Sequence, residues 1–401
     1  MKILEITNVD FSLRQFLFPL MLALRDDGHD VIGVCADGPL LADVRACGLR
    51  VETVPMSRTL SPFAQWRAWR GLVRLIRAEK PDMVHAHMPI SGLLARFAAW
   101  RCGVPCIAYT CHGFLFNQPG SRVRRGVALG LEWLAGRVTD IYLTVSDREA
   151  RDARRLHIHP RATAIGNGRD PATFHPMPEQ RAALRARMGV GADQVVILAV
   201  SRLVRGKGYP ELLAAMRALP DNAVLWVVGT RLPSDRGVDL GACFAAARAA
   251  LGTRLVMFGY RADVARVMAA ADIFVLPSHF EGLPMSVIEA MLCGLPVVAS
   301  DISGPCEQVV SGQTGLLVPP GNVPRLAAAL EHLVHDSALR RHMGEAGRMR
   351  ALACYTQAEI MARTVPLLTA GHPAVAKNAL QIMKKFLVKL FSKSFRKMPP
   401  F

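Results

Sequence analysis

Several features that would place a chain in a common class of protein are missing here. The 401-residue sequence has no run of about 18 apolar residues, so we expect no segment that spans a bilayer. Its nine cysteines stand singly, without the CxxC spacing of a zinc site. Met1 and Lys2 lead directly into an alternating apolar segment, so we expect no secretory signal. Together these absences predict a protein of the reducing cytoplasm, with free thiols.

Two more absences bear on function. No Gly-x-Gly-x-x-Gly loop follows the first predicted strand, which argues against a dinucleotide-dependent oxidoreductase. The sequence also shows no zinc-finger spacing, no interleaving of aromatic and basic residues and no helix-turn-helix. We therefore expect no nucleic-acid partner. A basic nucleic-acid-binding protein is the weaker alternative that the charge of the chain suggests.

Positive charge is abundant and unevenly distributed. The formal net charge is +17. Between residues 58 and 161, 17 Lys and Arg stand against 7 Asp and Glu, which leaves +10 in about a quarter of the chain. Such a surface attracts polyanions, including phosphorylated substrates and an anionic membrane. Solvated, Arg-rich helix faces would give the same count.

Apolar segments of strand length alternate with helical segments along the chain, which predicts parallel sheets with helices on both faces. The first series of strands is expected at Ile3–Thr7, Val31–Cys35, Met83–Ala86, Ile107–Thr110 and Ile141–Val145. Its helices are expected at Phe16–Asp26, Leu40–Ala46, Phe63–Glu79 and Ser91–Arg101. The second series of strands is expected at Val195–Ser201, Ala223–Val228, Arg254–Phe258, Ile273–Leu276, Val297–Ala299 and Gly315–Val318.

Turn residues between Gly166 and Pro178 separate the two series. We therefore predict an α/β fold of two doubly wound, Rossmann-like domains, residues 1–172 and 173–365. Ligands of such sheets bind at the carboxyl ends of the strands. Residues 366–401 form a basic tail, in which Lys377–Phe401 carries seven Lys and Arg and no acid. As an amphipathic helix this tail would contact an anionic membrane, and the alternative is a solvated tail.

The segment Ser201–Gly208 follows a predicted strand and contains a possible diphosphate site. Arg202 and Lys207 stand five residues apart in a loop with glycines. The planar guanidinium group and the compact ammonium group both bind phosphate oxygens, so the pair can hold a diphosphate.

A second group of residues follows the strand predicted at Ile273–Leu276. Glu281 and Gly282 precede a helix that contains Glu289 and ends at Gly294. Gly282 allows backbone to approach a ligand, and Pro284 suits the first helical position. The free amides at the start of this helix offer a site for phosphate.

The stretch from Glu281 to Glu289 resembles the two-glutamate signature of retaining glycosyltransferases with the two-lobed GT-B fold. More narrowly, the chain resembles the glycogen-synthase-like, mannosyltransferase-rich group known as family 4. Ser201–Gly208 resembles the phosphate loop of that family, and Asn167–Asp170 with Phe174 and Pro176 resembles its interdomain segment. The resemblance covers roughly residues 1–365, is strongest from 195 to 320, and implies two domains that face each other across a cleft.

The resemblance also implies roles for individual residues. Arg202 and Lys207 would bind the donor diphosphate, Glu281 would contact the donor sugar, and Glu289 would hold the ribose hydroxyl groups. The backbone of Gly282, Leu283 and Pro284 would lie near the phosphate. His112, after the strand Ile107–Thr110, resembles the family histidine that faces the donor sugar. We expect His112, Glu281, Arg202 and Lys207 to be the catalytic residues, with no cofactor and no metal ion.

Three residues of the first domain are weaker candidates for the acceptor side, namely Asp10, Arg14 and His87. The loop Asn8–Arg14 departs from the family because it has no glycine. His85 and His87 point to one face of a strand, but no third metal ligand is evident. Ser146 suits either ligand contact or the N-cap of the next helix.

The resemblance implies transfer of a hexose-type sugar, with retention, from a UDP- or GDP-sugar to a glycan or lipid-linked glycan. Exopolysaccharide or envelope polysaccharide synthesis is the expected pathway. The basic first domain and the tail predict a cytoplasmic enzyme that is peripheral on the inner face of the plasma membrane. Another GT-B enzyme, such as a nucleotide-sugar epimerase or a phosphorylase, is the closer alternative.

Overall fold

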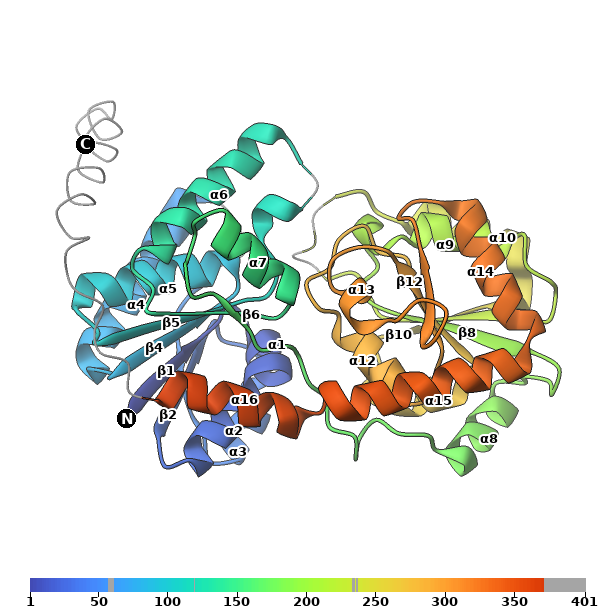
Figure 1. Cartoon of the computed structure of the whole chain (residues 1–401), viewed down its shortest axis with the longest axis horizontal. Helices are drawn as coiled ribbons and strands as arrows, with labels where there is room; N and C mark the ends of the chain where they lie inside the picture. Colours follow the sequence, from blue (N-terminus) through green and yellow to red (C-terminus); the bar gives the residue numbers. More distant parts are fainter. Residues whose placement is uncertain (57–60, 119, 233–234, 236, 371–401) are drawn as a thin grey trace.

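The computed structural model describes residues 1–56, 61–118, 120–232, 235 and 237–370. The chain forms two α/β domains side by side, each a parallel sheet with helices on both faces (Figure 1). This confirms the predicted GT-B architecture. Among the described residues, every helix falls short of the length and apolar character that crossing a bilayer requires.

The first domain has a seven-stranded sheet in the order β3-β2-β1-β4-β5-β6-β7. Its strands are β1 (Lys2–Ile6), β2 (Asp30–Cys35), β3 (Arg50–Thr53), β4 (Met83–His87), β5 (Cys106–Cys111), β6 (Ile141–Thr144) and β7 (Thr163–Ala164). Its helical segments are α1 (Asp10–Ser12), η1 (Leu13–Leu17), α2 (Phe18–Asp26), α3 (Leu41–Ala46), α4 (Pro62–Glu79), α5 (Pro89–Cys102), η2 (Leu115–Asn117), α6 (Arg122–Gly136) and α7 (Asp147–Arg155).

The second domain has a six-stranded sheet in the order β10-β9-β8-β11-β12-β13. Its strands are β8 (Val195–Val200), β9 (Ala223–Val228), β10 (Leu255–Gly259), β11 (Ile273–Leu276), β12 (Val297–Ser300) and β13 (Gly315–Val318). The helical segments that follow the linker are α8 (Pro178–Arg187), η3 (Arg205–Lys207), α9 (Tyr209–Met216), α10 (Gly241–Leu251), η4 (Gly252–Arg254), α11 (Val264–Ala270), α12 (Met285–Leu292), α13 (Pro305–Gln308), α14 (Val323–His335), α15 (Ser337–Cys354) and α16 (Gln357–Thr369).

Every predicted strand is present, with ends that differ by no more than one residue. Strands β4 and β9 are buried along their whole length, as expected where helices cover both faces of a sheet. The segment Asn8–Arg14, expected as a loop, is instead largely helical, because α1 and the π-helical η1 begin at Asp10. No glycine or proline interrupts this segment, so nothing stops the helix from starting early.

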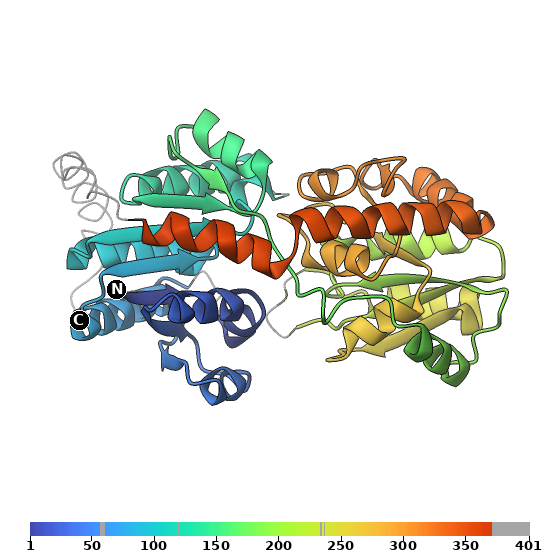
Figure 2. The ribbon, with the colours of Figure 1, turned by 60° about the horizontal axis from the view of Figure 1, so that its bottom comes forward.

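The last described helix, α16, returns to the first domain. It packs against α2, and its Leu368 lies in the core of the first domain. In both views α16 runs along the first domain while α15 runs along the second (Figure 2). The sequence predicted that the second domain extends to residue 365. In the structure, α16 (Gln357–Thr369) packs on the first domain instead. The predicted amphipathic tail falls almost entirely in residues 371–401, which lie outside the described part of the chain.

Candidate active site

The two sequence motifs of the second domain meet at the carboxyl ends of the neighbouring strands β8 and β11. The backbone N–H of His279 donates to the carbonyl oxygen of Gly206 over 2.9 Å. Gly208 has a φ of +75°, and a Cβ placed on it would lie 1.9 Å from the carbonyl oxygen of Pro277. Only glycine fits so close an approach, and it holds the predicted phosphate loop against the loop after β11.

Lys207 and Glu281 form an ion pair at this meeting point. The Nζ of Lys207 lies 2.6 Å from Oε1 of Glu281, and the hydroxyl group of Ser278 donates to the same oxygen over 2.6 Å. The Glu281 side chain is largely buried. Arg202 lies in the same loop, but its guanidinium group is about half exposed and pairs with Asp235. The structure therefore brings the predicted phosphate ligand Lys207 to the predicted sugar contact Glu281.

The loop before α12 lies directly against the first domain. A Cβ placed on Gly282 would be 3.2 Å from the carbonyl oxygen of His112. The helix begins at Met285, so Pro284 is its N-cap and not, as predicted, its first residue. The extended backbone of Pro284 explains the shift, since it has a ψ of 124°. Gly282, Leu283 and Pro284 thus form the N-terminal approach to α12, as the motif required.

Glu289 lies on α12 and binds the linker between the domains. Its Oε1 accepts a hydrogen bond from Nε of Arg169 over 2.6 Å. Arg169 also donates to the carbonyl oxygen of Gln15 in the first domain over 3.1 Å. The sequence identified the linker by its turn residues but gave Arg169 no partner, because 120 residues separate it from Glu289.

A pocket between the domains is lined by residues of both and of the linker. Its lining includes His112 and His87 of the first domain, Arg169 of the linker and Met285 of the second domain. Further lining comes from Gln15, Phe16, Thr110 and Asn167. The predicted acceptor-side residues Asp10 and Arg14 are not among these described lining residues.

The side chains of Asp10 and Arg14 have partners within the first domain. The Asp10 carboxylate accepts hydrogen bonds from the backbone N–H groups of Phe11 (2.7 Å) and Leu40 (3.3 Å). Arg14 lies over the ring of Phe18. Ser146 is the N-cap of α7, where its hydroxyl oxygen accepts from the N–H of Glu149 over 3.2 Å.

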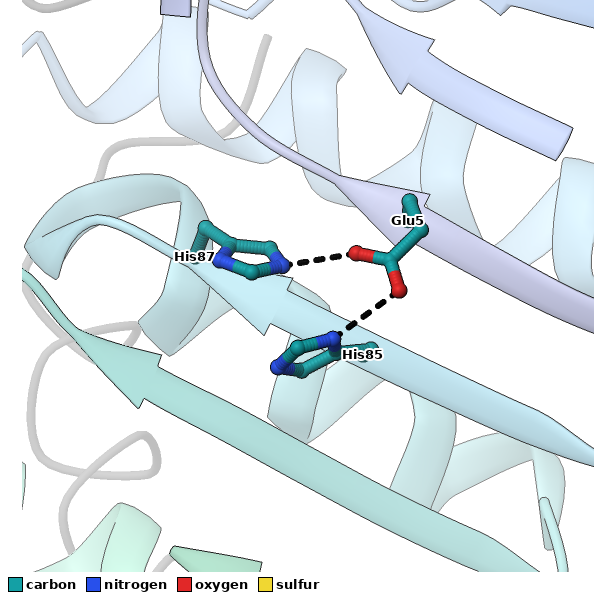
Figure 3. A group of neighbouring side chains, drawn as sticks. All are labelled: Glu5, His85 and His87. Atoms are coloured by element: carbon teal, nitrogen blue, oxygen red, sulfur yellow. Dashed lines mark hydrogen bonds and ion pairs between the residues drawn. The ribbon is translucent and has the colours of Figure 1, made fainter. Parts of the chain in front are cut away.

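Three buried ionisable side chains, Glu5, His85 and His87, lie close together in the first domain (Figure 3), and His87 links them to His112. Glu5 on β1 accepts from Nδ1 of His85 over 2.9 Å and from Nε2 of His87 over 2.7 Å. On its other side, Nδ1 of His87 lies 3.2 Å from Nε2 of His112. The sequence predictions missed Glu5. Register was the available signal, because β1 pairs with β4 so that Glu5 lies beside His85.

Burial and pairing shift the pKa values of this chain of groups. Burial alone would raise the pKa of Glu5, but the two histidines that it binds outweigh burial and lower its pKa to about 2. Burial and the neighbouring His85 lower the pKa of His87 to about 4. Burial and the same two histidines hold the pKa of His112 well below its usual range. At neutral pH, Glu5 is therefore a carboxylate, and His87 and His112 are neutral.

Glu5, His85 and His87 also have the composition of a metal site. Their ligand atoms all lie within 4.8 Å of one another. Two ligands bound at about 2.0–2.1 Å to one tetrahedral zinc ion would lie about 3.3 Å apart. The observed distances of 2.7 and 2.9 Å are instead those of hydrogen bonds. These residues fit a hydrogen-bonded carboxylate better than a zinc centre.

Comparison with known proteins agrees with this arrangement. Residues 180–350 match the family described as Glycosyl transferases group 1, and residues 14–168 match the Glycosyl transferase 4-like domain. A D-inositol 3-phosphate glycosyltransferase of Kribbella flavida is 32% identical over an alignment of 352 residues, and the match covers 79% of this chain and 81% of the relative. A UDP-Gal:alpha-D-GlcNAc-diphosphoundecaprenol alpha-1,3-galactosyltransferase of Escherichia coli is 28% identical over 79% of this chain and 83% of the relative.

Solved structures show the same fold. Anabaena HepE, in complex with UDP and glucose, superposes with a TM-score of 0.81 at 23% identity. The match covers 92% of this chain and 100% of HepE. The chain therefore belongs to the group 1 glycosyltransferases and is a glycosyltransferase of the GT-B fold.

Proposed function

We propose that the protein transfers a hexose-type sugar from a nucleoside-diphosphate sugar, with a uridine or guanosine base, to a lipid-linked or polysaccharide acceptor. We further propose that the reaction proceeds with retention and without a metal ion or cofactor. The observation that carries this proposal is the convergence of Lys207, Glu281 and the start of α12 on one point opposite His112. The relatives support it by name, since one uses UDP-Gal and a diphosphoundecaprenol acceptor and another binds UDP and glucose.

The geometry supplies positive charge where a diphosphate leaves. The ammonium group of Lys207 pairs with Glu281, and we expect it to bind the donor by exchanging that carboxylate for phosphate oxygens. Free amides at the start of α12 add hydrogen-bond donors and the positive end of the helix dipole. Glu289, steadied by Arg169, supplies a carboxylate for the ribose hydroxyl groups. Such preorganised charge stabilises a leaving diphosphate without a metal ion.

Binding of the donor is tested by thermal unfolding with UDP, GDP, ADP or NAD, in the presence of EDTA. A ligand at 100 times its Kd stabilises the folded protein by about 2.7 kcal/mol. We expect UDP or GDP to raise Tm, and Lys207→Ala and Glu289→Ala to abolish the rise. Arg217→Ala, which removes an exposed cation of the same domain, is the control. If no nucleoside diphosphate raises Tm, the proposed donor site is wrong.

Product analysis separates this proposal from the other GT-B activities. With a lipid-linked acceptor, the NMR coupling of the new anomeric proton should show the configuration of the donor sugar. An inverted product would contradict retention. Free epimerised sugar or sugar phosphate, in place of a glycoside, would instead identify an epimerase or a phosphorylase.

We also propose that the enzyme acts on the inner face of the plasma membrane, as a peripheral protein. Helix α6 exposes a row of apolar side chains at a spacing of four residues, Val123, Val127 and Leu131. Arg122 and Arg124 are exposed in its first turn. A helix that displays apolar and cationic residues together has the character of an interfacial segment. The basic tail beyond residue 370 would add to this attraction.

Vesicle co-sedimentation of the full chain tests membrane binding. We expect binding to vesicles of phosphatidylglycerol and little binding to phosphatidylcholine. The double variant Val127→Ser, Leu131→Ser should reduce binding, whereas Val238→Ser, at an exposed position of the second domain, should not. Removal of Lys377–Phe401 measures how much the tail contributes to vesicle binding. Equal recovery with both lipids, or no effect of the double variant, would contradict a role for α6.

A further inference from the structure

Glu5 determines which nitrogen of each neighbouring histidine carries the proton in the hydrogen bonds that join Glu5, His87 and His112. Glu5 is completely buried, and each of its carboxylate oxygens lies at hydrogen-bond distance from one histidine nitrogen. An ionised carboxylate has only acceptors. The protons in these two hydrogen bonds therefore sit on Nδ1 of His85 and Nε2 of His87.

The position of the proton on His87 determines its position on His112. A neutral imidazole carries one proton, and in His87 that proton is on Nε2. Its Nδ1 is therefore an acceptor, and the group 3.2 Å away is Nε2 of His112. Only a proton on Nε2 of His112 completes that hydrogen bond. His112 is then the tautomer whose remaining nitrogen, Nδ1, carries a lone pair.

The free nitrogen of His112 is available to the pocket. His112 is partly exposed and lines the pocket between the domains. Its only described hydrogen bond is the one to His87. Its backbone oxygen lies against Gly282, next to the Glu281 and Lys207 pair. A hydroxyl group of the proposed donor sugar is the hydrogen-bond donor that this acceptor nitrogen can bind.

We propose that Glu5 is a positioning residue which, through His87, holds His112 as the acceptor of a hydrogen bond from a hydroxyl group of the transferred sugar. This inference rests on the proposed function. The same principle operates where a buried carboxylate fixes the tautomer of a catalytic histidine. His85 hydrogen-bonds to the other oxygen of Glu5 through Nδ1, and its Nε2 lies 2.8 Å from the hydroxyl group of Thr110. The carboxylate is therefore held from both sides.

The tautomer is measured directly in the unmodified protein. We expect NMR of histidine labelled with ¹⁵N, at pH 7 and with UDP bound, to show Nε2 protonated and Nδ1 unprotonated in both His87 and His112. The signals are assigned by their loss in His87→Gln and His112→Gln. A proton on Nδ1 of His112, or a doubly protonated His87, would overturn the proposal. So would one equivalent of zinc bound to the purified protein.

The variant Glu5→Gln allows the donor and acceptor roles in the hydrogen bonds from residue 5 through His87 to His112 to be exchanged. Its amide group donates to one histidine, so His87 can present Nδ1–H to His112 and shift the proton of His112 to Nδ1. We expect that shift in the spectrum, and a fall in kcat/KM with UDP-galactose of about 10-fold, the effect of one lost substrate hydrogen bond. The rise in Tm with UDP should remain. Glu79→Gln, which removes a carboxylate paired with Lys2 and Arg50, should change neither the position of the proton on His112 nor kcat/KM.

Deoxy donors distinguish positioning from a general structural role. Single hydroxyl groups of UDP-galactose are replaced by hydrogen in turn. For the analogue that lacks the hydroxyl bound to His112, wild type and Glu5→Gln should react equally, because the interaction is already gone. A 10-fold difference that persists with every analogue would overturn the proposal. If Glu5→Gln does not fold, the wild-type spectrum alone decides. If neither UDP nor GDP binds while the tautomer is as expected, the proposed function fails and the inferred tautomer stands.

Discussion

Two buried glutamates of the first domain show how surroundings set the charge of a residue. Glu5 accepts hydrogen bonds from two histidines and has a pKa lowered to about 2. Glu149, on α7, has a pKa raised to about 8, chiefly by burial, although hydrogen bonds from the Phe114 backbone and Ser146 oppose the rise. Its Oε2 has no hydrogen-bond partner among the described residues. Glu149 is therefore mostly protonated at neutral pH, whereas Glu5 is ionised.

The raised pKa of Glu149 makes stability depend on pH. In the unfolded chain this carboxyl group loses its proton near pH 4.5, and in the folded protein near pH 8. The folded state therefore binds more protons between these values, so its contribution to stability is complete below pH 4.5 and is lost as pH rises through 8. The slope for one proton is about 1.4 kcal/mol per pH unit. Glu149→Gln should remove this loss and be more stable than the wild type at pH 8.

Urea unfolding at pH 5, 6, 7 and 8 measures this effect. The free energy of unfolding of Glu149→Gln relative to wild type should increase steadily with pH. Glu345→Gln, at an exposed site on α15, provides the matched control and should follow the wild type. Parallel pH profiles for wild type and Glu149→Gln would show that Glu149 is already ionised in the folded protein.

At the scale of elements, the apolar strands were predictable and the polar or very short ones were not. β9, β11 and β13 have the ends that the sequence predicts, because each is a continuous apolar run between turn residues. β3 (Arg50–Thr53) was missed because it alternates apolar and polar residues at the sheet edge, and β7 (Thr163–Ala164) because two residues carry no pattern. The positions of the loops that carry Lys207 and Glu281 could be predicted from the spacing of residues in the sequence. The partners of Glu5 and Arg169 could not be predicted, because they depend on strand register and on contact between the domains.

Of the two glycines that flank Lys207, the conformation of the loop depends on Gly208 and not on Gly206. Gly208 has a positive φ and lies against the carbonyl oxygen of Pro277, whereas a Cβ on Gly206 would meet nothing within 4 Å. Gly208→Ala should therefore destabilise the protein by about 1–3 kcal/mol, displace Lys207 and abolish stabilisation by UDP or GDP. Gly206→Ala should keep both properties. Thermal unfolding with and without nucleotide compares them, and equal behaviour of the two variants would refute the role of the close approach.

For the whole molecule, the contacts between domains come from residues far apart in the sequence. The Glu307 carboxylate, at α13, accepts hydrogen bonds from the backbone N–H groups of Asp147 and Arg148, each over 2.8 Å. These amides begin α7, where the helix dipole favours a negative charge. Arg169 and α16 provide further links. No pattern in the sequence indicated Glu307, because its side chain acts 160 residues away on a backbone that any residue could provide.

Loss of the Glu307 carboxylate should favour separation of the domains. Hydrogen bonds to a charged group contribute about 1.5–3 kcal/mol, so Glu307→Ala should shift the population toward an open form and raise KM for the donor. The backbone oxygen of Glu307 still binds Arg350 and Tyr355, so the second domain keeps its local structure. Small-angle X-ray scattering should show a larger radius of gyration for Glu307→Ala, and Glu345→Gln should match the wild type. An unchanged radius with an unchanged KM would mean that Arg169 and α16 hold the domains together without Glu307.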